Sequence, residues 1–194
     1  MIKQLILVRH GETLHNVAGI AQGWNDSALS DKGREQIRTL AERLHAYAPT
    51  AIYSSPLGRA LSTAEVIANA TGLNVVTLDD LREMNYGAWE GRSFLDVRRE
   101  YEDIYQRWIN DETCPCPDGG ESHADVRARL DRAFATMSSE RPIVVTHGTA
   151  IRIAATGLLR LPVMASRHFA QDNAGMNVFV WRQDRWVLKV WNQT

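Results

Sequence analysis

Short apolar runs separated by segments of helical periodicity constrain the fold of this chain more than any other feature. The runs are Leu5–Val8, Ile52–Ser55, Val75–Leu78 and Ile143–Thr146. Continuous apolar runs of this length are typical of strands that are buried on both faces. Strands that alternate with helices form mainly parallel sheets covered by helices on both faces. We therefore predict an α/β fold of this kind, as a single domain over residues 1–194.

The segments between the apolar runs carry helix start and stop signals. Ser30 can cap a helix whose apolar face extends from Ile37 to Tyr47. Pro56 is placed for the first turn of a second helix, which Gly72 would end. A further helix is predicted over 122–137, with its apolar residues facing inward.

Two further regions extend this α/β plan. We interpret residues 84–121, with a helix over 93–110, as an insertion that covers part of the site. Its aromatic residues Tyr101, Tyr105 and Trp108 favour packing within the insertion, although they could form a platform for substrate. The runs 176–181 and 186–191 predict a C-terminal β-hairpin.

Polar residues that suit phosphate chemistry follow the predicted strands. They are Arg9 and His10 after the first strand, Arg59 after the second, Glu83 past the third and His147 after the fourth. The carboxyl ends of parallel strands share one crevice, where ligands bind. Arginine offers a planar fork of donors that suits phosphate, and a neutral imidazole can attack phosphorus. We therefore predict a phosphoryl-transfer site at which His10 is the nucleophile.

Other residues close to this predicted site have weaker signals. Gly11, directly after His10, could let the backbone approach an anion closely. His15 and His123 lie near the site in the expected fold, and either could reach the substrate. An ordinary surface or packing position is the favoured interpretation for both histidines.

Composition restricts the partners of the chain. The formal net charge of -1 gives no basic surface for nucleic acid, and no stretch approaches the roughly 20 apolar residues of a membrane span. Cys114 and Cys116 are separated by one residue, too few for the usual paired-cysteine metal or redox motif. We expect a cytoplasmic protein that needs no metal or cofactor and acts on a small phosphorylated metabolite.

Several motifs resemble the histidine phosphatase superfamily, in its phosphoglycerate-mutase-like branch. They are Leu7–Thr13, Gln22–Trp24, Leu29–Gly33, Ser54–Ala60, Leu81–Gly91 and Val144–Gly148. The motifs follow one another in the family's order and span nearly the whole chain, which makes the resemblance specific.

The resemblance implies a role for each residue at the strand ends. His10 would be phosphorylated, while Arg9, Arg59 and His147 would hold the transferring phosphoryl group. Glu83 would protonate the leaving oxygen and then deprotonate the attacking water. These roles agree with the chemistry of the residue types, because phosphoryl oxygens need cationic donors and one acid must serve both half-reactions.

The resemblance also implies a substrate-binding set and makes a metal unnecessary. Asn16 matches the asparagine that follows the first motif, and Gln22 and Gly23 belong to the next block. With Gly11, these residues are the expected substrate contacts. The insertion 84–121 and the segment 160–175 are expected to select the substrate.

Hydrolysis and mutase chemistry both fit a phosphohistidine. Sugar-acid mutases of this family typically carry an arginine after the acid and an asparagine two residues past the second histidine; here these positions hold Met84 and Thr149. We therefore favour a phosphatase similar to alpha-ribazole and broad-specificity phosphatases. A cofactor-dependent phosphoglycerate-type mutase is the alternative, and a non-catalytic phospholigand-binding protein is a third. A homodimer paired along the edge of the hairpin is left open.

Overall fold

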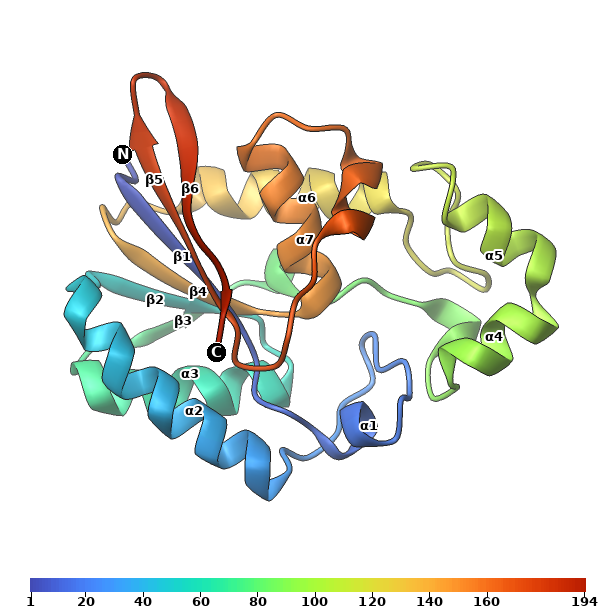
Figure 1. Cartoon of the computed structure of the whole chain (residues 1–194), viewed down its shortest axis with the longest axis horizontal. Helices are drawn as coiled ribbons and strands as arrows, with labels where there is room; N and C mark the ends of the chain where they lie inside the picture. Colours follow the sequence, from blue (N-terminus) through green and yellow to red (C-terminus); the bar gives the residue numbers. More distant parts are fainter.

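A six-stranded sheet, in the order β3-β2-β4-β1-β5-β6, forms the centre of the molecule in the computed structural model, which describes residues 1–194 (Figure 1). The strands are β1 (Gln4–Arg9), β2 (Ala51–Ser54), β3 (Val75–Thr77), β4 (Pro142–Thr146), β5 (Met176–Arg182) and β6 (Arg185–Gln193). Strands β1 to β4 run parallel to one another. The β5–β6 hairpin pairs with β1 through β5, and both of these pairings are antiparallel. The predicted fold class and C-terminal hairpin are confirmed.

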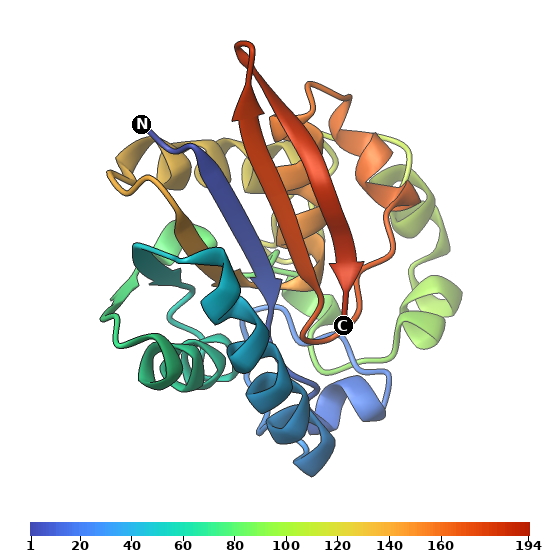
Figure 2. The ribbon, with the colours of Figure 1, turned by 60° about the vertical axis from the view of Figure 1, so that its left-hand side comes forward.

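Helices cover both faces of the sheet (Figure 2). One face carries α2 (Asp31–Leu44) and α3 (Gly58–Thr71), and the other carries α6 (His123–Thr136) and α7 (Gly148–Leu158). Successive side chains of a strand point to opposite faces. Accordingly, Leu5 and Leu7 of β1 belong to one buried cluster, whereas Ile6 and Val8 belong to another. The wholly apolar run at the N-terminus is therefore needed to serve two cores.

The shorter elements connect this framework. They are α1 (Leu14–Val17), α4 (Phe94–Glu100), α5 (Glu102–Trp108) and the 3-10 helices η1 (His45–Tyr47), η2 (Asp79–Leu81), η3 (Gly87–Trp89) and η4 (Val163–His168). No helix combines the length and the apolar character that crossing a membrane would require.

Two helix boundaries agree with their sequence signals and one does not. The Ser30 side chain accepts a hydrogen bond from the Gly33 amide and caps α2. Gly72 ends α3 with φ of 71°, a left-handed conformation that favours glycine. Pro56 does not lie in the first turn, because Leu57 is the N-cap residue and α3 begins at Gly58.

Strand β3 was wrongly predicted to be buried on both faces. It lies at the edge of the sheet and pairs only with β2. The side chain of Val76 is 49% exposed as a result. An apolar run indicates a strand, but the position of that strand in the sheet depends on long-range pairing.

The insertion 84–121 contains two helices in place of the single helix predicted over 93–110. The helix is interrupted at Tyr101, whose φ of -121° and ψ of 36° are not helical. Trp89 is fully buried and makes edge contacts with Tyr101 and Trp108. It also belongs to the cluster that contains Leu5 and Leu7, so the insertion shares a core with the sheet.

Candidate active site

A cavity of about 420 Å³ lies at the carboxyl end of β1 and the N-terminal end of α7. Its volume falls within the range of roughly 300–1,000 Å³ that is usual for small-molecule sites. Of the residues predicted from the sequence, the lining includes Arg9, His10, Asn16, Gln22, Gly23, Arg59 and Glu83. No group of three or more His, Cys, Asp or Glu side chains is arranged to hold a metal ion.

His10 presents one ring nitrogen for chemistry. Its Nδ1 lies 2.8 Å from the carbonyl oxygen of Gly11, which can only accept a hydrogen bond, so Nδ1 carries the proton. The side chain is only 2% exposed. Burial, followed by the charges of Arg9 and Arg59, holds the pKa of His10 well below its usual value. The ring is therefore neutral at pH 7, and Nε2 keeps the lone pair of a nucleophile.

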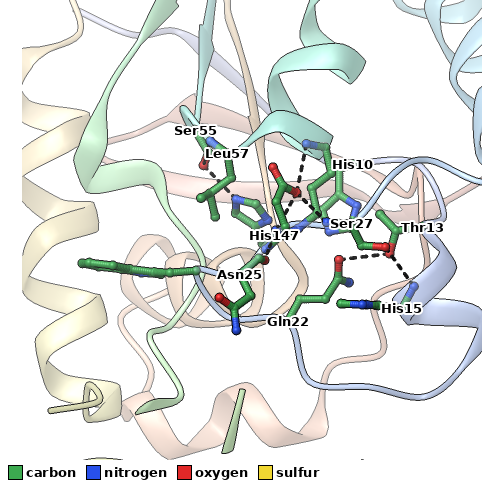
Figure 3. Close-up of polar contacts among 12 residues, drawn as sticks. His10, Thr13, His15, Gln22, Asn25, Ser27, Ser55, Leu57 and His147 are labelled. Carbon is green, nitrogen blue, oxygen red and sulfur yellow. Dashed lines mark hydrogen bonds and ion pairs between the residues drawn. The ribbon is translucent and has the colours of Figure 1, made fainter. Parts of the chain in front are cut away.

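His147 packs beside His10 behind the cavity wall. The two ring centroids are 5.2 Å apart, and Nε2 of His147 lies 2.8 Å from the hydroxyl oxygen of Ser55 (Figure 3). Its Nδ1 makes no hydrogen bond within the protein. Complete burial and the charge of Arg59 lower the pKa of His147 well below its usual value. The structure thus brings the two predicted histidines together from β1 and β4.

Both predicted arginines are held by hydrogen bonds that leave their Nε donors free. Arg59 is 2% exposed; its Nη2 donates to the Gly23 carbonyl at 2.7 Å and its Nη1 to Asp26 at 3.1 Å. Nη1 of Arg9 donates to the carbonyl oxygen of Gln171. The Nε atoms of both arginines make no hydrogen bond within the protein. Each guanidinium is therefore oriented before a ligand binds.

Glu83 is held by backbone amides at the start of α7. Its Oε1 accepts hydrogen bonds from the amides of Met84, at 2.8 Å, and Ala150, at 3.1 Å, while Oε2 accepts one from Thr149 at 3.1 Å. The N-terminus of a helix favours negative charge because its first amides are unpaired and its dipole is positive there. Glu83 is 8% exposed and lines the cavity, in agreement with its predicted position in the phosphoryl-transfer site.

The predicted substrate contacts divide into two groups. Asn16, Gln22 and Gly23 line the cavity. The hydroxyl of Thr13 is 3.0 Å from the side-chain oxygen of Gln22 (Figure 3). It is also 3.0 Å from the side-chain oxygen of Asn16, and this network orders the wall. His15, although close in sequence, is not among the lining residues.

Gly11 has a different function from the one predicted. It does not line the cavity, and its amide donates to the hydroxyl of Thr63 at 3.2 Å. A Cβ atom at this position would lie 2.6 Å from Ile37 Cδ1 and 2.7 Å from the carbonyl oxygen of Gly33. Glycine is therefore required for the close approach of α2 to the strand end, and the predicted anion contact is not supported.

Three cavity residues were missed or undervalued in the sequence. Arg152, on α7, and Arg167, in η4, line the cavity together with His123 at the start of α6. Arg152 lies four residues after Gly148, which also lines the cavity, so helical spacing could have revealed it. Arg167 offers no such signal because its segment has no regular pattern. His123 is 3% exposed and lines the cavity, whereas an ordinary surface or packing position was favoured for it.

Two of the three aromatic residues considered in the insertion line the cavity, and Tyr101 does not. Tyr105 and Trp108 line the cavity, as do Tyr86 and Phe94, and Trp108 also packs against Trp89 with centroids 5.3 Å apart. The hydroxyl of Tyr86 lies 2.7 Å from that of Thr149, next to the amide that holds Glu83. Packing and the shape of the site are therefore provided by the same side chains.

Comparison with known proteins identifies the family of the chain. Residues 5–194 match the histidine phosphatase superfamily (branch 1). A relative from Erwinia tasmaniensis named "Probable phosphoglycerate mutase GpmB" is 35% identical over 193 residues, which cover 97% of this chain and 89% of the relative.

Solved structures with the same fold carry phosphatase names. A mycobacterial glucosyl-3-phosphoglycerate phosphatase has a TM-score of 0.87 at 34% identity, covering 99% of this chain and 100% of its own. An alpha-ribazole phosphatase from Shigella flexneri has a TM-score of 0.87 at 29% identity, covering 98% and 96%. With the family match spanning almost its whole length, this chain belongs to the histidine phosphatase superfamily.

Proposed function

We propose that this protein is a metal-independent phosphatase that hydrolyses small-molecule phosphate monoesters through a phosphohistidine at His10. The observation that carries the proposal is the state of His10: a buried, neutral ring whose Nδ1 proton is bound by Gly11, in the wall of a cavity that also holds Arg9, Arg59 and Glu83. A neutral imidazole can attack phosphorus only through an unprotonated nitrogen, and here that nitrogen is Nε2.

In the first half-reaction, the lone pair of His10 Nε2 forms a bond to phosphorus while the phosphorus–oxygen ester bond breaks. The carboxyl group of Glu83 donates its proton to the leaving oxygen, which departs as an alcohol. Arg9 and Arg59, which line the cavity, bind the equatorial oxygens, where charge is redistributed in the transition state. We assign the same role to His147, which is not itself a lining residue, because its buried Nδ1 has no partner within the protein.

In the second half-reaction, a water molecule attacks the phosphohistidine. Glu83, now a carboxylate, takes a proton from this water, and the phosphorus–nitrogen bond breaks to return the lone pair to His10 Nε2. Inorganic phosphate leaves, and the enzyme has its initial protonation state. One carboxyl group thus serves as acid and then as base.

A phosphoglycerate-type mutase is the second candidate, because relatives such as the one from Erwinia tasmaniensis carry that name. Both activities share the first half-reaction and differ in the group that accepts the phosphoryl group. The structural neighbours named as phosphatases support hydrolysis. Met84, at the position where mutases have an arginine, is fully buried in a hydrophobic cluster and contributes nothing to the cavity.

Phosphate release from a panel of monoesters tests the proposal. The panel contains 3-phosphoglycerate, phosphoserine, sugar phosphates, nucleotides and alpha-ribazole phosphate, assayed without added metal. We expect steady phosphate release by the wild type and none by His10→Ala. His45→Ala should keep full activity, because it alters an exposed histidine at the end of α2 that does not line the cavity. Transfer between phosphoglycerates that depends on a bisphosphate primer would favour the mutase. Binding without turnover or labelling of His10 would favour a non-catalytic protein.

A further inference from the structure

The cavity is lined by more residues than a phosphoryl group would contact. Among the others is a set that we call the distal subsite: Tyr105, Trp108, His123, Arg152 and Arg167. These residues come from α5, from the first turn of α6, from α7 and from η4. The hydrolysis described above uses none of them, although two are cationic.

The two distal arginines have no acidic partner in their hydrogen bonds. Nη2 of Arg152 donates to the hydroxyl of Thr149 at 2.8 Å, and its Nε donates to the carbonyl of Gly148 at 3.3 Å. Arg167 donates to the carbonyl of Ile109. By contrast, Arg59 at the phosphoryl end is paired with Asp26 at 3.1 Å. Two positive charges therefore face the cavity without a compensating carboxylate.

Arg152 adjoins the residues that hold the acid. Its Nη2 bonds to the hydroxyl of Thr149, whose backbone amide donates to Glu83. Because Glu83 would protonate the leaving oxygen, the alcohol portion of the substrate would extend from there past Arg152. Burial, followed by the charge of Arg152, lowers the pKa of His123 in the same cavity. A guanidinium in this position offers the planar fork that binds a carboxylate through two hydrogen bonds.

His123 supplies an uncharged polar group beside this fork. Its side chain is 3% exposed, and its Nδ1 makes no hydrogen bond within the protein. The ring lies against Trp108, with centroids 4.8 Å apart. A buried polar atom without a partner is costly, so a ligand atom that completes its hydrogen bond contributes to binding.

We propose that the substrate is a phosphate monoester whose alcohol portion bears a carboxylate, which Arg152 binds, with His123 beside it and Arg167 at the mouth of the cavity. One carboxylate is sufficient to balance the charge of Arg152. Arg167 needs no second anionic group, because it is exposed and solvent screens its charge. This inference rests on the proposed function, and it identifies Arg152 as the residue that determines specificity. It also supplies the carboxylate contact that the sequence, with Met84 after the acid, did not reveal.

Matched substrate pairs test the inference. In one pair, 3-phosphoglycerate is compared with glycerol 3-phosphate, which has a hydroxymethyl group in place of the carboxylate. In the other, phosphoserine is compared with phosphoethanolamine, which lacks only the carboxylate. We expect kcat/KM of the wild type to favour the carboxylate member of each pair by about 10- to 100-fold, the range expected for a hydrogen bond to a charged group.

Variants assign this preference to Arg152. Arg152→Gln should lose most of it, Arg152→Lys should keep a part, and Arg38→Gln should keep all of it, because Arg38 is an exposed residue on α2 that pairs with Glu35. The readout is the ratio within each pair, so a general loss of activity through Thr149 and Glu83 cancels. Thermal unfolding of each variant verifies folding. Arg167→Gln removes the second, exposed arginine of the distal subsite and should lower the preference less than Arg152→Gln does.

The outcomes separate this inference from the proposed function. Equal kcat/KM within both pairs, or a preference that survives Arg152→Gln, would overturn the inference, while hydrolysis of either substrate would uphold the phosphatase. If no monoester is hydrolysed, the phosphatase proposal fails, and calorimetry with His10→Ala decides the inference. Tighter binding of 3-phosphoglycerate than of glycerol 3-phosphate would support it, and equal affinities would reject it.

Discussion

The two ends of the cavity differ in how their side chains are held. At the phosphoryl end, His10 and Arg59 are each 2% exposed and Glu83 is 8% exposed, and each has backbone hydrogen-bond partners. At the distal end, Arg167 is exposed and belongs to a segment with no regular strand or long helix. Groups that perform chemistry must be preorganised, whereas groups that recognise the alcohol portion can be carried by segments that vary more freely.

The difference also follows from topology. The phosphoryl end is built where β1 and β4, which are adjacent parallel strands, reach their carboxyl ends. The distal subsite combines the insertion helix α5 and the short η4 with the first turns of α6 and α7. Arg167 joins η4 to the end of α5 through its bond to Ile109. The fold thus fixes the reaction at the sheet and leaves specificity to its surroundings.

The largest effect is expected from removing the nucleophile. His10→Ala should reduce phosphate release to background, a loss of roughly 10⁶-fold, as when a nucleophile is deleted from a covalent catalyst. Rapid-quench labelling should detect no phosphohistidine. His45→Ala, which alters an exposed histidine at the end of α2 and outside the cavity lining, is the matched control and should retain full activity. Turnover at the wild-type rate in His10→Ala would show that His10 is not the nucleophile.

The next largest effect is expected at Glu83. Glu83→Gln cannot donate or accept the proton and should lower hydrolysis of alkyl phosphates by about 10²–10⁴-fold. The first step should suffer less with p-nitrophenyl phosphate, whose leaving group needs no proton, so phosphohistidine should accumulate after a burst of nitrophenol. Equal losses on both kinds of substrate, with no burst, would contradict the acid–base role.

The amide group of Glu83→Gln also has a structural consequence. One oxygen of Glu83 would become an NH₂ group that faces a backbone N–H, so one of the donors at Met84, Thr149 and Ala150 would lose its acceptor. An unsatisfied buried donor costs about 1–3 kcal/mol of folding free energy. Chemical denaturation of the variant measures this cost separately from the loss of rate.

An intermediate effect is expected on stability at low pH. Burial lowers the pKa of His123 from 6.5 to about 4. The unfolded chain therefore binds the proton more readily, and the free energy of unfolding should fall as the pH drops from 6.5 to 4. A shift of this size corresponds to about 3 kcal/mol at the acidic end.

Denaturation of His123→Gln at pH 7 and pH 4.5 measures this contribution. The variant should show a smaller loss between the two pH values than the wild type, although His10 and His147, whose pKa values are also lowered, act in the same direction. His45→Gln, at an exposed position, should behave like the wild type. Identical pH dependence in all three proteins would mean that His123 is not buried in its neutral form.

The smallest effect is expected at the mouth of the cavity. Arg167→Gln removes an exposed charge and should lower kcat/KM for carboxylate-bearing monoesters by only about two- to fivefold. Since exposed charges are screened by salt, the difference from the wild type should shrink at 1 M ionic strength. An effect as large as that of Arg152→Gln would make the two arginines equal partners and redraw the distal subsite.

Local sequence patterns predicted the elements and the strand-end residues well. The apolar runs agree with β1, β2 and β4 to within one residue at each end. Ser30 caps the start of α2 and Gly72 ends α3, as expected. The residues after the strands converge because parallel strands share one direction. Their catalytic roles stay predictions until the variants are measured.

What failed depended on contacts between distant segments. The exposure of β3 follows from its place at the edge of the sheet, and the helix is interrupted at Tyr101, which packs against Trp89 from another part of the insertion. Gly11 is required by the approach of α2, which no local sequence pattern indicates. His123 and Arg167 line one cavity only because η4 lies against the end of α5, so neither residue could be assigned from its neighbours in the chain.

The amides that hold Glu83 have a consequence for evolution. Two of them belong to Thr149 and Ala150, and any residue except proline provides the same N–H group. The core packing of Ala150 restricts its side chain, but Thr149 lines the cavity and can change without removing the support of the acid. Because its hydroxyl bonds to Tyr86 and Arg152, a substitution there would alter the wall of the cavity and leave the hydrogen bond to Glu83 in place.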